Sequence, residues 1–518
     1  MKKNFIIQLS VLLWTAISFS SCDLDINVNP NFATGSVVTP DLILPGSIAA
    51  LAEDINTYNK FGALMVGYQF PGDGLSGFGD LYSYNYTSAS DTGLWNNAYA
   101  HLRDIQDIIT VSDENPYYIY FGAAAHVIRA YTYHLLVDEY GNVPYFEGIR
   151  GDANIAPAFD DDAAVYQAII EELSDAVATF QAAEASSDIP LAFSRVTDPL
   201  FGGNIVKWIQ FANNLKLRLL LRAAGTEIDG FVQSAFNSFS AEGFLKEDAL
   251  INPGYNASSK QNPFYNDYHS SVTGAISQYA HYYLPTTYLL TFYLGTKLQD
   301  DRRGALLYRD YPATPHYQLG KQDEGRPYTP GYIWLESVLK GREQGFGAFY
   351  AFETYFLLAE AAATGHELDG DWKTNFEKGI AASFRYLEST ASGSLVADAD
   401  PEADAKAYIE ANAGSYLANP DLATTPAQQL EAIITQKYIA SNPINAHEAW
   451  NDFRRTAYPV INNAGRQPEL TFASYLSDSP REDKMLVRHV YPQAEYDLNA
   501  NTPDVGNSFS NPIFWDKN

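Results

Sequence analysis

Cysteine is nearly absent from this chain of 518 residues, which contains only Cys22. A single thiol cannot form an intramolecular disulfide, so covalent cross-links cannot stabilise the fold. A large buried core has to supply that stability, and the length of the chain allows one. A chain with one cysteine beside its N-terminus also offers no thiol nucleophile within its body.

Positive charge is scarce as well. Lys and Arg total 33 against 62 Asp and Glu, a net charge of −29, and removal of the first 21 residues would take away Lys2 and Lys3 and make it −31. Such a chain repels nucleic acid and anionic membrane surfaces, so we expect no nucleic-acid partner. The acids are scattered through a sequence that is 46% hydrophobic, which argues against disorder.

Long apolar runs are missing too. The segment 5–19 is mostly apolar, but a helix needs roughly 20 residues to cross a hydrocarbon core. It follows the basic start Met1-Lys2-Lys3 and is followed by the small residues Ser20 and Ser21. This order is typical of a cleavable export signal, which we place at residues 1–21.

Cys22 follows that signal directly. The sequence Phe19-Ser20-Ser21-Cys22 resembles the lipobox of bacterial lipoproteins, with Phe19 where Leu is usual. The alternative is a secreted protein that is cut near Ser21 and keeps a free thiol. We favour lipidation of Cys22, because an unpaired exposed thiol is a liability in an oxidising compartment. The chain would then be anchored to a membrane by lipid.

Signatures of catalysis and metal binding are also lacking. The sequence contains no Gly-x-Ser-x-Gly and no phosphate-binding Walker loop. His447-Glu448 comes nearest to a zinc motif, but Asn451 stands where the second histidine is needed. His126 and His134 are interpreted as packed or capping residues. We therefore predict no catalytic residues, metal or cofactor, although a glycosidase carboxylate pair cannot be recognised from sequence.

What the chain does contain is helical periodicity. Apolar residues recur every three or four positions in five segments of the first half, at 42–60, from Trp95, at 118–140, 162–180 and 203–224. Paired helices follow at about 350–455, where small residues such as Ala359 allow close approach, as in tetratricopeptide hairpins. Thr425-Pro426-Ala427-Gln428 combines a capping box with proline at the first helical position.

Two segments break this pattern, at about 62–92 and 252–334. The first is rich in glycine and the second in proline, and both are crowded with tyrosine. Segments of this kind are more often functional loops than connectors. We therefore predict a mostly α fold, in which tetratricopeptide-like helix hairpins pack against an irregular loop-rich lobe. Residues 22–39 are an extended tether, and 40–518 form a single body.

The irregular segments also supply the candidate ligand-binding residues. A sugar ring has an apolar face that can lie on an aromatic side chain, while its hydroxyls need polar partners close by. Taken singly, each of these residues is more often a core residue, so the prediction concerns the set. Its members are Asp73, Tyr82, Tyr84, Tyr282, Tyr283, Tyr317 and Trp334.

Five ordered segments resemble the SusD/RagB family of nutrient-binding outer-membrane lipoproteins. They are Asp138 to Tyr145, Trp208 to Arg222, Glu353 to Gly365, Ile434 to Tyr438 with Glu448 to Pro459, and Arg488 to Pro492 with Glu495 and Asn499. The resemblance covers essentially the whole chain after the signal. Trp450, Arg454 and Arg455 within these segments are interpreted as structural residues without a binding role.

The resemblance implies a non-catalytic binding protein at the cell surface, held in the outer membrane by lipid. Its partner would be a SusC-like TonB-dependent transporter barrel, to which it would pass an oligosaccharide. A peptide ligand with the same role is the alternative, and a surface glycoside hydrolase is a third.

Overall fold

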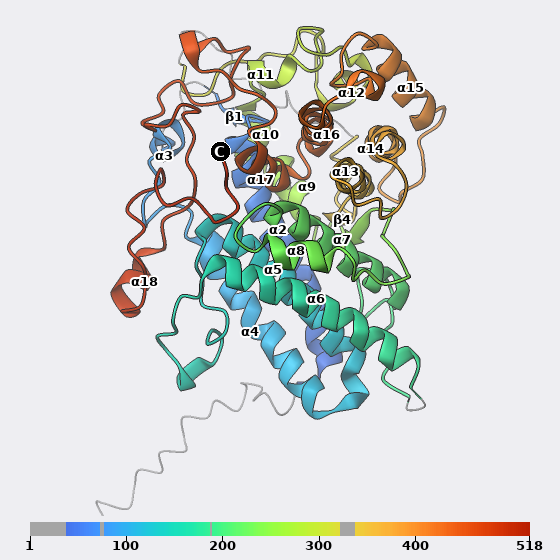
Figure 1. Ribbon diagram of the computed structural model, residues 1–518, viewed down its shortest axis with the longest axis vertical. Helices are drawn as coiled ribbons and strands as arrows, with labels where there is room; N and C mark the ends of the chain where they lie inside the picture. Colours follow the sequence, from blue (N-terminus) through green and yellow to red (C-terminus); the bar gives the residue numbers. More distant parts are fainter. Residues whose placement is uncertain (1–37, 73–76, 187–188, 322–336) are drawn as a thin grey trace, which may run out of the picture. The chain divides into compact units, whose positions relative to one another are not determined.

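The computed structural model describes residues 38–72, 77–186, 189–321 and 337–518 (Figure 1). The described body, Pro40–Asn518, forms one compact unit. Cys22, the predicted signal and all but the end of the predicted tether lie outside the described residues, as do Asp73 and Trp334. The prediction of a lipid-bearing Cys22 therefore stays a prediction.

Five long helices make up the N-terminal half. They are α2 (Pro40–Met65), α4 (Gly93–Glu114), α5 (Ile119–Tyr140), α6 (Asp162–Glu184) and α7 (Ile205–Ala223). Neighbours in sequence pack side by side from α4 to α7, and α2 lies against α4 and α5. The side chain of Asp161 caps α6 by accepting a hydrogen bond from the backbone N–H of Ala164 at 3.1 Å.

The C-terminal third contains the expected helix pairs. They are α13 (Ala351–Ala363) with α14 (Trp372–Leu387), and α16 (Pro426–Ser441) with α17 (Ala446–Thr456). The capping box is confirmed, because Thr425 and Gln428 each bond the other's backbone at the start of α16. Two further helices, α8 (Asp229–Ala235) and α15 (Pro401–Ala411), were not predicted. The mostly α fold class is confirmed.

Short elements occupy the irregular segments and the chain's end. The helices are α3 (Gly79–Ser83), α9 (Pro263–Tyr268), α10 (Gln278–Tyr282), α11 (Thr287–Leu290), α12 (Asp301–Leu307) and α18 (Gln493–Leu498). Single 3₁₀ turns lie at Pro116–Tyr118, Gly151–Ala153, Pro420–Leu422 and Ala464–Arg466. Strand β1 (Phe70–Pro71) pairs antiparallel with β3 (Tyr283–Leu284), and β2 (Ala249–Ile251) with β4 (Phe346–Phe349).

The first irregular segment begins later than predicted. Helix α2 continues to Met65, past the expected end at Lys60, because Gly62 allows it to pack closely on α17. A Cβ at Gly62 would lie 2.6 Å from the backbone nitrogen of His447. The glycine that suggested a loop is therefore a site of helix packing. Among the described residues, no helix combines the length and the apolar character needed to cross a bilayer.

Candidate functional site

The two predicted irregular segments meet at the β1–β3 pair. The backbone N–H of Gly72 donates to the carbonyl of Tyr282 at 2.7 Å, which extends the pairing. Farther along, the hydroxyl of Thr286 donates to the carbonyl of Gly67 at 2.6 Å. Segments about 200 residues apart in sequence are thus joined by backbone hydrogen bonds.

Aromatic side chains from both segments form a continuous row across this junction. Tyr279 stacks on Tyr283 with ring centroids 4.4 Å apart, and Tyr283 meets Phe78 edge-on at 6.3 Å. Phe78 in turn lies 6.4 Å from Tyr82. We call these four residues the aromatic row. Helix α3, strand β3 and helix α10 position it, because each is too short to bury its residues on all sides.

Three of the predicted tyrosines are partly exposed in this region. Tyr82 belongs to the row, and Tyr282 directly precedes Tyr283, which is the buried member of the row. Tyr317 lies nearby in the fold, because its carbonyl accepts a hydrogen bond from the backbone N–H of Thr287 at 3.0 Å. All three pack against the core with part of the ring accessible, as a stacking surface requires.

Two other predicted binding residues are buried, and their assignment as ligand contacts is wrong. Tyr84 is fully buried, and its hydroxyl accepts a hydrogen bond from the backbone N–H of Ser474 at 3.1 Å. Tyr283 is only 3% exposed, because Tyr279 covers one side and Phe78 approaches its edge. Tyr283 supports its neighbours and does not itself face a ligand.

The hydroxyls of Tyr279 and Tyr283 in the row are uncharged at physiological pH. Burial raises the pKa of Tyr283 above its ordinary value, and the nearby Tyr279 hydroxyl raises it further. Burial likewise raises the pKa of Tyr279, against the opposing effect of Lys60. The row is therefore an apolar surface edged by neutral hydroxyls, which suits a neutral polar ligand better than a charged one.

Sequence reasoning missed three aromatics of this region, Phe78, Tyr279 and Tyr475. Tyr475 is 36% exposed, and the guanidinium of Arg466 lies 4.6 Å from its ring centroid. Its backbone N–H donates to the carbonyl of Leu319 at 2.8 Å, which brings it beside the second irregular segment. Phe78 and Tyr279 lie within the two predicted segments and could have been chosen. Tyr475 lies in the region after Arg455, and nothing local distinguishes it.

Elsewhere on the described part of the body, clefts open with volumes of about 730, 400 and 300 Å³. The first lies at the C-terminal end of α17, the second between α4 and α18, and the third between β2 and α14. None of the predicted binding residues lines any of the three. The row is separate from these clefts.

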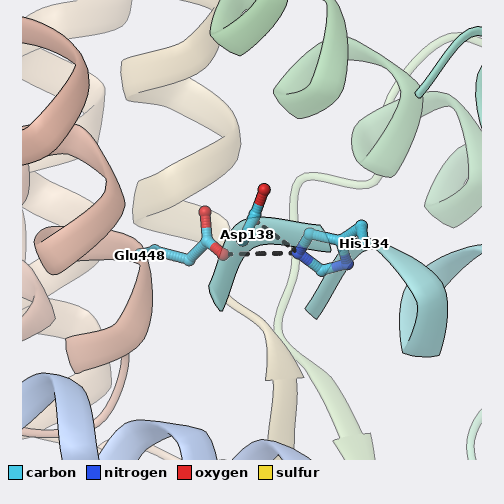
Figure 2. Close-up of side chains that lie close together, drawn as sticks. All are labelled: His134, Asp138 and Glu448. Carbon is cyan, nitrogen blue, oxygen red and sulfur yellow. Dashed lines mark ion pairs between the residues drawn. The ribbon is translucent and has the colours of Figure 1, made fainter. Parts of the chain in front are cut away.

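A cluster of ionisable groups lies in the interior. Figure 2 shows His134 and Asp138 from α5 facing Glu448 from α17. Nε2 of His134 is 3.5 Å from a carboxylate oxygen of Glu448 and 3.8 Å from one of Asp138. All three side chains are buried, as a metal site would allow.

Arginine side chains already neutralise the negative charge of these carboxylates. Arg222 forms ion pairs with both Asp138 and Glu448, and Arg218 lies 3.3 Å from Glu448. Burial alone would raise the pKa of Glu448, but the two guanidinium groups hold it well below its usual range. Burial lowers the pKa of His134, which keeps its imidazole neutral. We interpret the cluster as a structural ion-pair network, because a cation would meet two arginines there.

The interpretation of the motif residues as structural is confirmed. Trp450 is fully buried, and Arg454 donates to the carbonyl of Val487 at 3.0 Å and to Glu139 at 3.2 Å. Arg455 forms a two-pronged pair with Glu360 that joins α17 to α13. Arg454 and Arg455 thus tie the end of α17 to its surroundings.

Comparison with known proteins identifies the family. A family model of SusD-like proteins, described as "Starch-binding associating with outer membrane", matches residues 33–492. No curated protein matches the chain.

Solved structures share the fold at low sequence identity. A chitin-binding SusD homolog from Flavobacterium johnsoniae is 21% identical, with a TM-score of 0.71 over 92% of this chain and 99% of that one. A SusD/RagB family protein from Bacteroides thetaiotaomicron is 21% identical, with a TM-score of 0.68 over 93% and 99%. A SusD homolog from Bacteroides fragilis is 20% identical, with a TM-score of 0.67 over 92% and 100%. The chain belongs to the SusD-like family, whose members associate with the outer membrane.

Proposed function

We propose that this protein is a non-catalytic, glycan-binding lipoprotein of the cell surface and that the aromatic row is part of its binding surface. The observation that carries the proposal is the meeting of partly exposed rings from two distant segments at the β1–β3 pair. Membership in a family described as starch-binding supports it independently of the row.

The chemistry of the row suits a neutral oligosaccharide. The partly exposed faces of Tyr82, Phe78 and Tyr279 can take the apolar faces of successive sugar rings. The hydroxyls of Tyr82, Tyr279, Tyr282 and Tyr317 can exchange hydrogen bonds with sugar hydroxyls. The net charge of −29 disfavours polyanionic glycans, which would be repelled before reaching the surface.

Titration calorimetry on variants tests the site. A stacked ring contributes about 0.5–1.5 kcal/mol beyond the area it buries. Replacing Tyr82 with alanine should therefore weaken binding of maltohexaose or chitohexaose about 2- to 12-fold. The double variant Tyr82→Ala/Phe78→Ala should lose about 10-fold or more.

Tyr117→Ala is the matched control, because Tyr117 is an exposed tyrosine in another part of the fold. It should bind as the unmodified chain does. Equal affinity of the double variant and the control would remove the row from the site. Binding of oligopeptides in place of both hexasaccharides would favour the peptide alternative, and release of shorter products over time would indicate a hydrolase.

The location and the partner extend the proposal. Lipid on Cys22 would hold the body at the outer membrane, and a SusC-like TonB-dependent barrel would receive the oligosaccharide. Purification from detergent-solubilised membranes should bring down a large barrel protein with this chain. A chain recovered alone from gently solubilised membranes would contradict the transfer role and leave glycan binding intact.

A further inference from the structure

The cleft of about 730 Å³ at the end of α17 lies outside the aromatic row, and we call it the C-terminal cleft. Helix α17 stops at Thr456, and Ala457 adopts a left-handed conformation with φ of 59° that turns the chain away. The following loop, 457–464, forms one wall. Residues 482–484 form the facing wall, and Phe453 and Asn518 also line the cleft.

Hydrogen bonds hold both walls in place. The hydroxyl of Tyr288 donates to the carbonyl of Val460 at 2.7 Å, and the backbone N–H of Asn462 donates to the carbonyl of Leu470 at 2.8 Å. The side chain of Asn463 then joins the two walls by donating to the carbonyl of Asp483 at 2.7 Å. The C-terminal cleft is therefore preformed, and its volume is within the range of small-molecule sites, about 300–1,000 Å³.

One wall is apolar. Tyr458, Val460 and Ile461 line it, and Val460 is 52% exposed although it is a large aliphatic residue. Burial raises the pKa of Tyr458, so its hydroxyl is a neutral hydrogen-bonding group. This wall offers an aromatic ring and aliphatic side chains to the apolar face of a ligand.

Hydrogen-bonding groups around the cleft have unused capacity. Within the described residues, the Tyr458 hydroxyl, the Nδ2 amide of Asn462 and the Glu482 carboxylate have no hydrogen-bond partner. The ammonium of Lys484 donates to the carbonyl of Ser479 at 3.0 Å and has further protons to offer. Donors and acceptors opposite an apolar wall match a ligand with an apolar face and a hydroxyl-bearing rim.

The cleft carries no excess of positive charge. Arg481 pairs with Asp483 at 2.8 Å and donates to the backbone oxygen of Asn518 at 2.7 Å, and Lys484 is the only basic residue among the described lining residues, which also include Glu482 and Asp483. Such a site gives no advantage to an anionic ligand. We infer that the C-terminal cleft binds a neutral saccharide as a second site, separate from the aromatic row. This inference goes beyond the proposed function and does not depend on the row.

Hydrogen exchange of the whole chain in detergent, with and without ligand, locates the site directly. Saturating maltohexaose or chitohexaose should slow exchange several-fold in peptides covering 457–464 and 480–485. Tetragalacturonate, an anionic saccharide, should have little effect there. Peptides covering 77–86 and 276–286 report on the aromatic row in the same experiment.

Two variants make the test specific. Tyr458→Ala removes the aromatic wall, and Glu482→Ala removes an exposed carboxylate that makes no hydrogen bond within the described part of the chain, so the fold should tolerate it. Both should reduce the protection of 457–464, while Tyr82→Ala should leave it unchanged. Protection of the row alone, protection that survives both cleft variants, or no protection by either neutral saccharide would overturn the inference. Protection of the cleft alone would support it and count against the row.

Discussion

Glu448 is the residue on which the interior ion network converges. It is 2% exposed and forms ion pairs with Arg222 and Arg218 of α7. Its carboxylate also lies 3.5 Å from Nε2 of His134 on α5 (Figure 2). Removal of one member of such a group leaves the opposite charges buried without a partner. We expect Glu448→Ala to lower the free energy of unfolding by about 3–5 kcal/mol, measured by urea denaturation.

Glu402→Ala is the matched control for that measurement. Glu402 pairs with Arg385 at 2.6 Å, but both side chains are more than half exposed. Water screens an exposed pair, so the control should lose only about 0–1 kcal/mol. Similar small losses in both variants would mean that Glu448 is not buried among these arginines.

His489 gives the fold a dependence on pH. Burial alone would lower its pKa, but the carboxylate of Asp91, 3.5 Å from Nε2, and the hydrogen bond between Nδ1 and Glu139 at 3.0 Å outweigh burial and raise the pKa to about 9. A histidine whose pKa is raised on folding stabilises the native state fully below its unfolded value of about 6.5. This contribution, on the order of 3 kcal/mol, should disappear as the pH rises from 6.5 to 9.

Urea unfolding at several pH values checks this expectation in the unmodified chain and in His489→Gln. The difference in stability between the two should be largest at pH 6 and should shrink toward pH 9. A difference that stays constant across this range would show that the imidazole is not protonated in the folded state.

For single residues, the sequence does not indicate that Tyr82 and Tyr282 are partly exposed while Tyr84 and Tyr283 are buried. Tyr82 and Tyr84 lie within one short segment, as do Tyr282 and Tyr283, and all four have the same side chain. Tyr84 is buried because Ser474 and Ser508, about 400 residues away, hydrogen-bond to it. Burial of this kind depends on tertiary neighbours, and the local sequence pattern does not reveal them.

Among the elements, the contact between α2 and α17 depends on Gly62. Its hypothetical Cβ would lie 2.6–2.7 Å from backbone atoms of Ala446 and His447, which cannot move aside as a flexible side chain could. Gly62→Ala should therefore cost about 2–3 kcal/mol of stability. The measurement is the shift of the urea midpoint relative to the unmodified chain.

Gly46 provides the control within the same helix. Nothing lies within 4 Å of its hypothetical Cβ, so alanine there should stabilise the chain by about 0.4–1 kcal/mol through reduced backbone freedom. Opposite signs for two identical substitutions in α2 are the expected result. Equal effects would contradict the close packing of α2 on α17.

Local signals predict helix starts better than helix ends in this chain. The capping box at Thr425 is a short-range feature, and it was found from sequence. Helix α15 carries a similar signal, with Asp400 as cap before Pro401, and could have been predicted as well. The extension of α2 to Met65 could not have been predicted, because glycine at position 62 indicates a loop when its contact with α17 is not known.

For the molecule as a whole, ordered sequence segments were sufficient to indicate the family. Their residues lie mostly in the buried network, where Arg222, Glu353 and Arg454 hold helices together. Such residues report on the fold and carry no information about the ligand. The binding surface comes instead from irregular segments whose side-chain exposure only the structure reveals.

The anchoring of the whole molecule is expected to depend on one atom, the sulfur of Cys22. No helix in the described ranges could span a bilayer, and the negative net charge disfavours adsorption to anionic lipid. Acyl chains contribute about 0.8 kcal/mol per buried methylene, so two or three chains hold a protein firmly. Cys22→Ser should move the chain from the membrane pellet to the soluble fraction, while Ser20→Ala, which keeps a small residue, should leave it in the pellet. Mass spectrometry of the unmodified chain should find Cys22 acylated at the new N-terminus, and a free thiol there would show that the membrane holds this protein by another means.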